Sequence, residues 1–273
     1  MTNIEKKPKN VEELYKMRGR FLDIVYKGHM HYAIFEPNED ISLFEAAAKF
    51  TNVLIEKVPL GEGQRFLDIG CGTGEPALEL VKLKGCQVDG INISREQIEQ
   101  ANNLAKKEQL ENLAKFHVAD AAELPFEDAV FDAGWFFDSI VHMSRSIVYR
   151  EAYRVLKPGG LLLVTDSAIP KGGPITDDDY KFLTNMVFIS PPVNREDYPT
   201  LLKDIGFEVL EFNELPNSEL VHRKVVELVD KHRDEILSWG GSEIYNYIHD
   251  FHRQVSEIYV RNFDHFLIVV RKP

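Results

Sequence analysis

Short apolar runs alternate with amphipathic segments through the middle of the chain. The apolar runs are RFLDIG, CQVDGINIS, AKFHVADA, VFDAGWFF and LLLVTDSA, all between residues 65 and 168. Each reads as a largely buried strand. The segments EPALELVKLKG, SREQIEQANNLAKKEQL and IVYREAYRVLKPGG carry apolar residues at helical spacing, and the last is expected to end at Pro158 and Gly159. Repeated strand–helix units with apolar strands predict a mostly parallel sheet with helices on both faces.

The pattern differs towards both ends of the chain. Residues 11 to about 58 predict mostly helices around the loop GHMHYAIFEPNED. After residue 166 an irregular region precedes EDYPTLLKDIGFEVLEF, which predicts a helix and a strand. Residues 218 to about 260 predict two charged helices broken at Gly240–Gly241, and FDHFLIVVRKP predicts a last strand.

Together these elements predict an α/β, Rossmann-like fold with a seven-stranded, mostly parallel sheet, additional N-terminal helices and a helical lid inserted before the last strand. The expected parts are an N-terminal helical cover over 1–58, a nucleotide-binding core over 59–168, the end of the core with a substrate loop over 169–215, a lid over 216–262 and a last strand over 263–273.

Composition narrows the classes of partner. The chain has 273 residues and a formal net charge of −12, which would repel a nucleic acid or an anionic membrane surface. Cys71 and Cys86 form neither a disulfide framework nor a metal quartet, which favours a reducing compartment. The charged first residues and the lack of a long apolar stretch favour a cytoplasmic protein. We expect a small-molecule substrate and leave open a homodimer.

The stretch LDIGCGTG holds the strongest chemical signal. Gly70, Gly72 and Gly74 follow a strand and precede a helix, where open α/β sheets bind nucleotides. Their G-x-G-x-G spacing differs from the G-x-G-x-x-G that cradles a dinucleotide pyrophosphate. Asp68 would repel a pyrophosphate, but it suits a ligand that carries an ammonium and a sulfonium. The motif therefore favours S-adenosylmethionine over a nicotinamide cofactor, and an oxidoreductase is disfavoured.

Two further strand ends support a nucleoside ligand. Asn92 ends the second strand, with Gln97 on the first turn of the next helix, where ribose-binding residues are expected. Asp120 ends the third strand and could simply cap a turn. Followed by ELPF, it is instead predicted to accept a hydrogen bond from an adenine amino group, beside the backbone of Ala121.

LDIGCGTG, GINIS, DAAELPFED and RVLKPGG resemble class I S-adenosylmethionine-dependent methyltransferases over residues 60 to 168. Within that family the chain is similar to small-molecule enzymes of secondary metabolism such as the rebeccamycin sugar O-methyltransferase, a likeness that HMHYAIF and the RKP terminus extend. The resemblance implies S-adenosyl-L-methionine as cofactor and S-adenosyl-L-homocysteine as product. It also implies that the loop around His31 and Tyr32 packs over the cofactor, although Ala33–Ile34 replaces the usual Gly-Tyr pair.

The aromatic run Trp135, Phe136 and Phe137 reads first as core packing. By its position on the rim of the cleft, Trp135 is also expected to contact the cofactor.

Methyl transfer to a hydroxyl needs a base for the acceptor proton. His142 follows the fourth strand and Asp166 ends the fifth, and the resemblance places a His and an Asp at matching positions. We expect His142 to take the proton and Asp166 to orient or charge the His142 ring. The structural alternatives are that His142 only closes a helix start and that Asp166 only caps a turn. The resembling enzyme has paired histidines, whereas Val141 precedes His142 here. Asp138 is a weaker candidate that could equally begin a helix.

No metal is expected. Asp177–Asp179 could hold magnesium for a diphosphate, but a capped, solvated helix start is favoured. His249 and His252 lie three apart on a helix without a third ligand, which favours an exposed helical face. The predicted function is S-adenosylmethionine-dependent methylation of a hydroxyl on a small metabolite. The alternatives are C- or N-methylation, including a prenyl diphosphate type, and a cofactor-retaining cyclase or isomerase.

Overall fold

The structure is a computed structural model of the whole chain. It describes residues 11, 13, 19–22, 24, 31–36, 39–170, 173, 175–187 and 189–273. Most of the helical segment expected before residue 31 therefore lies outside the described residues, as do the first residues of the HMHYAIF loop.

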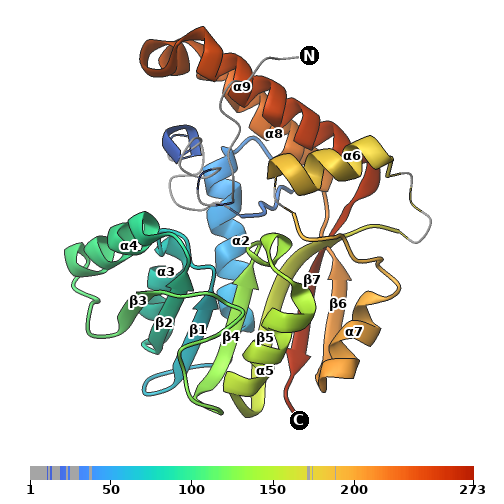
Figure 1. Cartoon of the computed structure of the whole chain (residues 1–273). Helices are drawn as coiled ribbons and strands as arrows, with labels where there is room; N and C mark the ends of the chain where they lie inside the picture. Colours follow the sequence, from blue (N-terminus) through green and yellow to red (C-terminus); the bar gives the residue numbers. More distant parts are fainter. Residues whose placement is uncertain are drawn as a thin grey trace.

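A seven-stranded sheet forms the centre of the molecule (Figure 1). Its strand order is β3-β2-β1-β4-β5-β7-β6, and only β7 runs antiparallel to its neighbours. This confirms the predicted mostly parallel, Rossmann-like sheet. The strands are β1 Arg65–Ile69, β2 Gln87–Asn92, β3 Ala114–Val118, β4 Phe131–Phe137, β5 Leu156–Ala168, β6 Glu208–Glu214 and β7 Asp264–Arg271.

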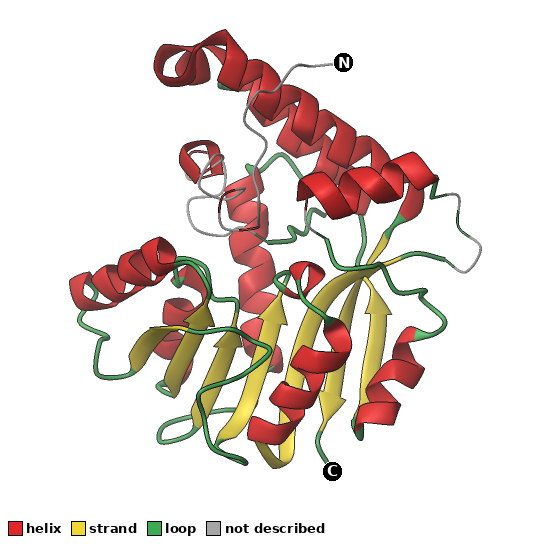
Figure 2. Cartoon of the chain, in the orientation of Figure 1, coloured by secondary structure: helices red, strands yellow, loops and turns green. Residues whose placement is uncertain are grey.

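Helices cover both faces of this sheet and its upper end (Figure 2). They are α2 Leu43–Lys57, α3 Glu75–Lys84, α4 Arg95–Lys107, η1 Ile140–His142, α5 Arg145–Val155, α6 Asp177–Phe182, η2 Leu183–Val187, α7 Tyr198–Ile205, α8 Ser218–Lys231 and α9 Arg233–Asn262. Helix α5 ends before the expected stop, because the chain turns into β5 at Leu156 and the KPGG segment belongs to that strand.

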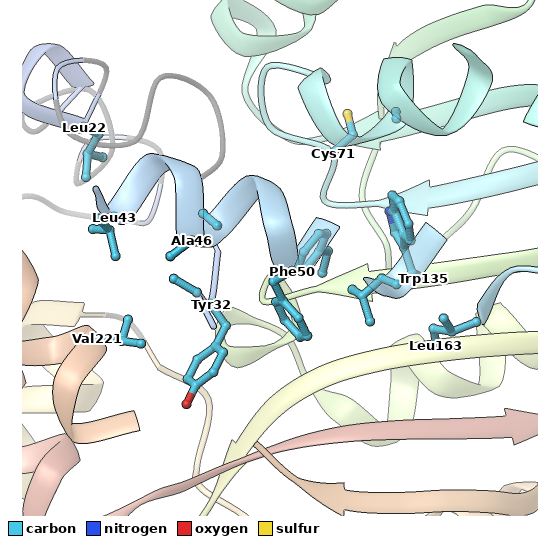
Figure 3. Close-up of a cluster of buried hydrophobic side chains, with 14 of the residues drawn as sticks. Leu22, Tyr32, Leu43, Ala46, Phe50, Cys71, Trp135, Leu163 and Val221 are labelled. Carbon is cyan, nitrogen blue, oxygen red and sulfur yellow. The ribbon is translucent and has the colours of Figure 1, made fainter. Parts of the chain in front are cut away.

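Two hydrophobic cores lie on opposite faces of the sheet. Successive strand residues point to opposite faces, so Trp135 packs into the core under α2 and α3, while Phe136 packs under α5. Figure 3 shows Trp135 within the first core, together with Phe50 of α2 and Leu163 of β5. This alternation fixes the pairing register, because a one-residue slip would turn each apolar set towards the wrong helices.

Helices α6, α8 and α9 lie over the carboxyl ends of the parallel strands (Figure 1). The predicted break is present, because Gly241 has non-helical backbone angles (φ 69°, ψ −177°) inside α9. A second break at His232, which the pattern did not predict, separates α8 from α9. His252 is buried and contacts the ring of Phe21 at 5.1 Å between centroids, so the expected exposed histidine face is wrong for this residue.

The acidic run at residues 177–179 begins α6. Thr176 and Asp179 form a capping box, and Asp179 also pairs with Arg261 at 2.6 Å. The capped helix start favoured by the sequence is therefore present. Within the described ranges, no cluster of three or more His, Cys, Asp or Glu side chains could hold a metal ion. No described helix has the length and apolar character needed to span a membrane.

The close pairing of β1 and β4 yields a test of this packing. A Cβ added to Gly134 would lie 2.8 Å from the carbonyl oxygen of Leu67, a backbone atom that cannot move aside cheaply. We expect Gly134→Ala to lower the free energy of unfolding by about 1–3 kcal/mol, as overpacked cores do. Urea denaturation measures the change.

Gly61→Ala is the matched control, because a Cβ there meets no atom within 4 Å. It should change stability by no more than about 1 kcal/mol, and in the stabilising direction. Equal stabilities for the two variants would contradict the described register.

Candidate active site

A cavity of about 400 Å³ opens at the carboxyl ends of β1, β2 and β4. We call it the first cavity. Most of the predicted cofactor residues line it, from segments that lie far apart in the sequence: Asp68, Gly70, Gly72, Asn92, Gln97, Asp120 and Ala121. The sheet brings them together because parallel strands end at the same edge.

Asp68 is the buried charge of the first cavity. It lies on β1 one residue before the strand ends, and no described Lys, Arg or His forms an ion pair with it. Burial raises the pKa of Asp68 to about 7, opposed only in part by the indole of Trp135. That indole contact is loose, since Nε1 of Trp135 has no hydrogen-bond partner within the described residues. An uncompensated buried carboxylate on a cavity wall is suited to a cationic ligand.

The three positions of the motif require glycine for different physical reasons. Gly70 (φ 83°) has no room for a Cβ, which would lie 2.3 Å from Cβ of Ser139. Gly74 (φ 88°) does not line the cavity; a Cβ there would lie 2.9 Å from the ring of Phe116. Gly72 (φ 54°) lines the cavity, and a Cβ there would meet no atom within 4 Å. Gly70 and Gly74 thus serve packing, and Gly72 leaves bare backbone towards a ligand.

The expected ribose and adenine positions carry polar groups at the cavity wall. The Nδ2–H of Asn92 donates to Oε1 of Gln97 at 2.7 Å, which holds both amides at the end of β2. Asp120 is exposed, and its Oδ1 accepts a hydrogen bond from the N–H of Ala122 at 2.8 Å. The turn-capping role of Asp120 is therefore present, and its other carboxylate oxygen makes no hydrogen bond to the described residues.

Two predicted cofactor contacts differ from expectation. Trp135 is fully buried and does not line the first cavity, because its strand position points it into the core against Phe66 and Phe137. Tyr32 lines a neighbouring cavity instead, and its hydroxyl donates to the carbonyl of Pro216 at 2.6 Å. His31 is the loop residue that reaches the first cavity.

That neighbouring cavity, the second cavity, has a volume of about 200 Å³ and lies between the sheet and the helical cover. Three residues line both cavities, and we call them the junction: His31, Asp138 and His142. The rest of the second cavity is largely aliphatic, from Leu22, Val141, Val187, Ile189, Val221, Val225 and Val255.

His31 is held rigidly at the junction. Its ring stacks on Phe137 with 3.8 Å between centroids. Nδ1 lies 2.9 Å from the carbonyl oxygen of Tyr32, and because a carbonyl can only accept, Nδ1 carries a proton. Nε2 lies 3.0 Å from the hydroxyl of Thr51 on α2.

Asp138 occupies a constrained position directly after β4. Its φ of 51° is in the left-handed region, which aspartate tolerates better than most residues. The backbone N–H of Tyr32 donates to Oδ2, and the N–H of Asp138 donates to Oγ1 of Thr165 at 2.8 Å. Burial raises the pKa of Asp138 to about 6; the charge of Asp166 adds to this, and Thr165 and the Tyr32 N–H oppose it.

Asp166 differs from its expected role as orienting partner. Its carboxylate accepts four hydrogen bonds: from Nε and Nη2 of Arg145 at 2.6 and 2.8 Å, from the hydroxyl of Tyr198 at 2.5 Å and from the N–H of Ser167 at 2.7 Å. A carboxylate has about four acceptor sites, so these donors fill it. Asp166 is thus the buried anchor that ties β5 to α5 and α7, and its carboxylate has no site left to orient His142.

His142 ends η1, the short helix that follows β4, and its half-buried side chain lines both cavities. The neighbouring Val141 carbonyl accepts a hydrogen bond from the N–H of Ser190 at 2.8 Å, which ties η1 to the segment between η2 and α7. The structure therefore places His142 and Asp138 at the same junction. The sequence named each as a candidate catalytic residue but did not indicate that they lie together.

Several lining residues carried no sequence signal. His222 on α8 and His265 on β7 line the second cavity, yet neither belongs to a motif or follows a parallel strand. Ser139 and Met143 flank η1 and line the first cavity. The sequence could not reveal His222 and His265 as cavity residues, because only the long-range packing of α8 and β7 brings them there.

Comparison with known proteins identifies the class. A family profile described as "Methyltransferase domain" matches residues 67–164. The (+)-O-methylkolavelool synthase of Herpetosiphon aurantiacus is 32% identical over 268 residues, covering 96% of this chain and 93% of that protein. The 27-O-demethylrifamycin SV methyltransferase of Amycolatopsis mediterranei is 34% identical, covering 74% of each chain. The solved [4+2]-cyclase SpnF is 28% identical with a TM-score of 0.81, covering 98% of this chain and 97% of that one.

The chain belongs to the class I S-adenosylmethionine-dependent methyltransferases, in the group that modifies small molecules of secondary metabolism. It is an S-adenosylmethionine-dependent methyltransferase, which confirms the predicted family, cofactor and enzyme class. The residues present fit this cofactor, since Asp68 lacks a cationic partner in the described part of the chain and Gly72 leaves its backbone bare.

The buried Asp68 predicts a pH-dependent affinity for S-adenosylhomocysteine. Its pKa of about 7 must fall when the ligand's ammonium arrives, so binding releases the Asp68 proton below pH 7. The dissociation constant should therefore rise by about tenfold for each pH unit below 7. Calorimetric titration between pH 5 and pH 8 measures this slope.

Asp68→Asn is the matched variant. It should weaken binding by roughly 2–5 kcal/mol at pH 8 and remove the slope. A carboxyl with a raised pKa stabilises the fold only while protonated, and that contribution is lost as pH rises through 7. The variant should therefore be no less stable than wild type at pH 8. A slope that persists in Asp68→Asn would show that another group titrates.

Proposed function

We propose that the enzyme methylates a hydroxyl of a small, largely apolar metabolite, with His142 as the base that removes the hydroxyl proton. The observation that carries the proposal is the junction, where His31, Asp138 and His142 line both cavities at once. A polar cavity with a buried carboxylate meets an aliphatic one there, as a cofactor site and an acceptor site must for direct transfer.

The first cavity would hold S-adenosylmethionine, which supplies the methyl group as a sulfonium. Asp68 binds its ammonium, Gly72 leaves space along its backbone, and Asn92 and Gln97 bind the ribose hydroxyls. Asp120 and the backbone of Ala121 bind the adenine edge. His31, rather than Tyr32, closes the cavity from the N-terminal loop.

The junction supplies the proton chemistry. His142 accepts the hydroxyl proton as the oxygen becomes nucleophilic, and general-base help of this kind contributes on the order of 10²- to 10⁴-fold. Asp138, rather than Asp166, supplies the negative charge beside the base. Its pKa of about 6 leaves it ionised at neutral pH, so its negative charge at the junction stabilises the imidazolium that forms. The proton leaves through His142 to solvent after transfer.

The helical cover completes the site. Helices α6, α8 and α9 lie over the strand ends (Figure 2), and α8 and α9 supply Val221, Val225 and Val255 to the second cavity. An acceptor held there is desolvated and aligned with the first cavity. Alignment of reacting groups can contribute about 7–11 kcal/mol in favourable cases, so positioning is the larger share of catalysis.

Replacing His142 should affect the rate of methyl transfer without affecting the binding of the cofactor product. His142→Ala should lower kcat by roughly 10²- to 10⁴-fold, because the acceptor proton loses its base. The dissociation constant of S-adenosylhomocysteine should stay within about threefold of wild type, because His142 only borders the first cavity. Mass spectrometry of the methylated product and of S-adenosylhomocysteine measures turnover on candidate alcohols.

His117→Ala is the control, since His117 pairs with Asp89 away from both cavities and should leave kcat unchanged. Wild-type turnover by His142→Ala would exclude the base. A rearranged product without formation of S-adenosylhomocysteine would contradict methyl transfer and favour a cyclase, and a methyl group on carbon or nitrogen would contradict the hydroxyl acceptor.

The raised pKa of Asp138 predicts an acid limb in the pH profile of kcat/KM. With its pKa of about 6, kcat/KM should rise as pH increases through 6, because only the ionised carboxylate stabilises the imidazolium. Asp138→Asn should lower kcat by at least about tenfold and move this acid limb to lower pH. A variant with the wild-type limb and rate would remove Asp138 from the mechanism.

A further inference from the structure

Two histidines lie side by side on the wall of the second cavity, away from the junction. His222 comes from α8 and His265 from the start of β7, and their ring centroids lie 5.4 Å apart. Tyr259 lies beside both, at 4.8 and 5.7 Å, and the ring of Tyr32 lies 4.9 Å from His265. These four rings make one wall of a cavity whose remaining lining is mainly aliphatic.

Neither imidazole forms a hydrogen bond with a described residue. Nε2 of His222 and Nδ1 of His265 are buried without a partner. Burial lowers the pKa of His222 to about 3 and that of His265 to about 4, so both rings are neutral. A buried polar group left unpaired costs about 1–3 kcal/mol, and native proteins contain few of them. The other nitrogen of each ring is not among these enclosed atoms, so two neutral imidazoles side by side on the cavity wall can each present a polar nitrogen to a ligand.

The charges around the second cavity exclude one class of ligand. Among its described lining residues there is no lysine or arginine. Its carboxylates are Asp138 and Asp166, and Arg145 already neutralises the second of these. A phosphate, diphosphate or carboxylate placed here would be desolvated without a counter-charge and repelled by Asp138.

We propose that His222 and His265 recognise an uncharged hydroxyl or carbonyl group of the acceptor, and that the second cavity selects neutral, largely apolar acceptors against anionic ones. A neutral imidazole has one donor and one acceptor nitrogen, so the pair can satisfy a group that both donates and accepts. This rests on the proposed function in treating the second cavity as the acceptor site, and it adds the specificity residues and the acceptor's charge.

Matched probes test the selectivity. Enzyme saturated with S-adenosylhomocysteine is titrated by calorimetry with geraniol and geranyl diphosphate, and with farnesol and farnesyl diphosphate. Each pair shares an apolar chain and differs in the charge of the head group. At least one alcohol should bind about tenfold or more tightly than its diphosphate. Equal or tighter binding of the diphosphates, or no binding of either alcohol, overturns the proposal.

Variants test the two histidines. His222→Phe and His265→Phe should each weaken alcohol binding by about tenfold, the loss expected when a hydrogen-bonding partner is removed. Their melting temperatures should not fall, because each change removes a buried, unpaired nitrogen, and S-adenosylhomocysteine should bind as to wild type. His222→Gln and His265→Gln retain hydrogen-bonding groups and should stay within about threefold of wild type.

His249→Phe is the control on the same helical cover, because His249 does not line the second cavity. Wild-type alcohol affinity in both Phe variants overturns the role of the pair, as does a loss in the Gln variants equal to that in the Phe variants. Failure of the proposed function has a different signature. An alcohol that binds with the predicted preference but is methylated on carbon contradicts the hydroxyl acceptor and leaves the binding inference intact.

Discussion

The reversal of strand order between β1 and β4 is the constraint on which the site depends. Strands β2 and β3 extend the sheet on one side of β1, and β4 and β5 extend it on the other. The loops after β1 and β4 therefore diverge and leave a crevice at their carboxyl ends, as in other open α/β sheets. Asp68 lies near the carboxyl end of β1 and Asp138 directly follows β4, and both line the first cavity. Asp138 also lines the second cavity.

Asp138 and Asp166 show how environment divides the roles of two nearby carboxylates. Asp166 is saturated by Arg145, Tyr198 and a backbone N–H, which makes it a structural anchor beneath the junction. Asp138 lacks a cationic partner among the described residues and has a raised pKa. Removing one partner of a buried ion pair is costly, so the Arg145–Asp166 pair holds β5 and α5 in place while Asp138 remains available for chemistry.

Polar groups left without partners mark both cavities. Asp68 borders the first, and His222 and His265 border the second. Each lowers the stability of the fold in its present form, since burial opposes the charge of Asp68 and leaves two imidazole nitrogens unpaired. Such stability costs are usual where a protein is built to receive a ligand rather than to pack against itself. The aliphatic remainder of the second cavity would add contact area without specifying charge.

The fold, and the set of residues that line the first cavity, can largely be predicted from local patterns. Apolar runs, a glycine turn after β1 and polar residues at strand ends are short-range features, and parallel strands necessarily bring their carboxyl ends to one edge. Residues such as Asp68, Asn92 and Asp120 are therefore expected together from the sequence, and all three line the first cavity. The aromatic run also predicts core packing for Trp135, and the residue is fully buried in the core, without the additional place on the cavity wall that its position at the strand end suggested.

The residues of the proposed acceptor site could be identified only from the tertiary structure. Its walls come from the loop around His31, from η1 and from helices inserted before the last strand, and packing rather than sequence spacing brings these together. We propose Asp138 rather than Asp166 as the partner of the base because Arg145 pairs with Asp166, a partner 21 residues away in the sequence that no periodicity reveals. Local sequence encodes which elements form and where their ends meet; which charges find partners is settled by long-range contacts, because burial and pairing are properties of the whole fold.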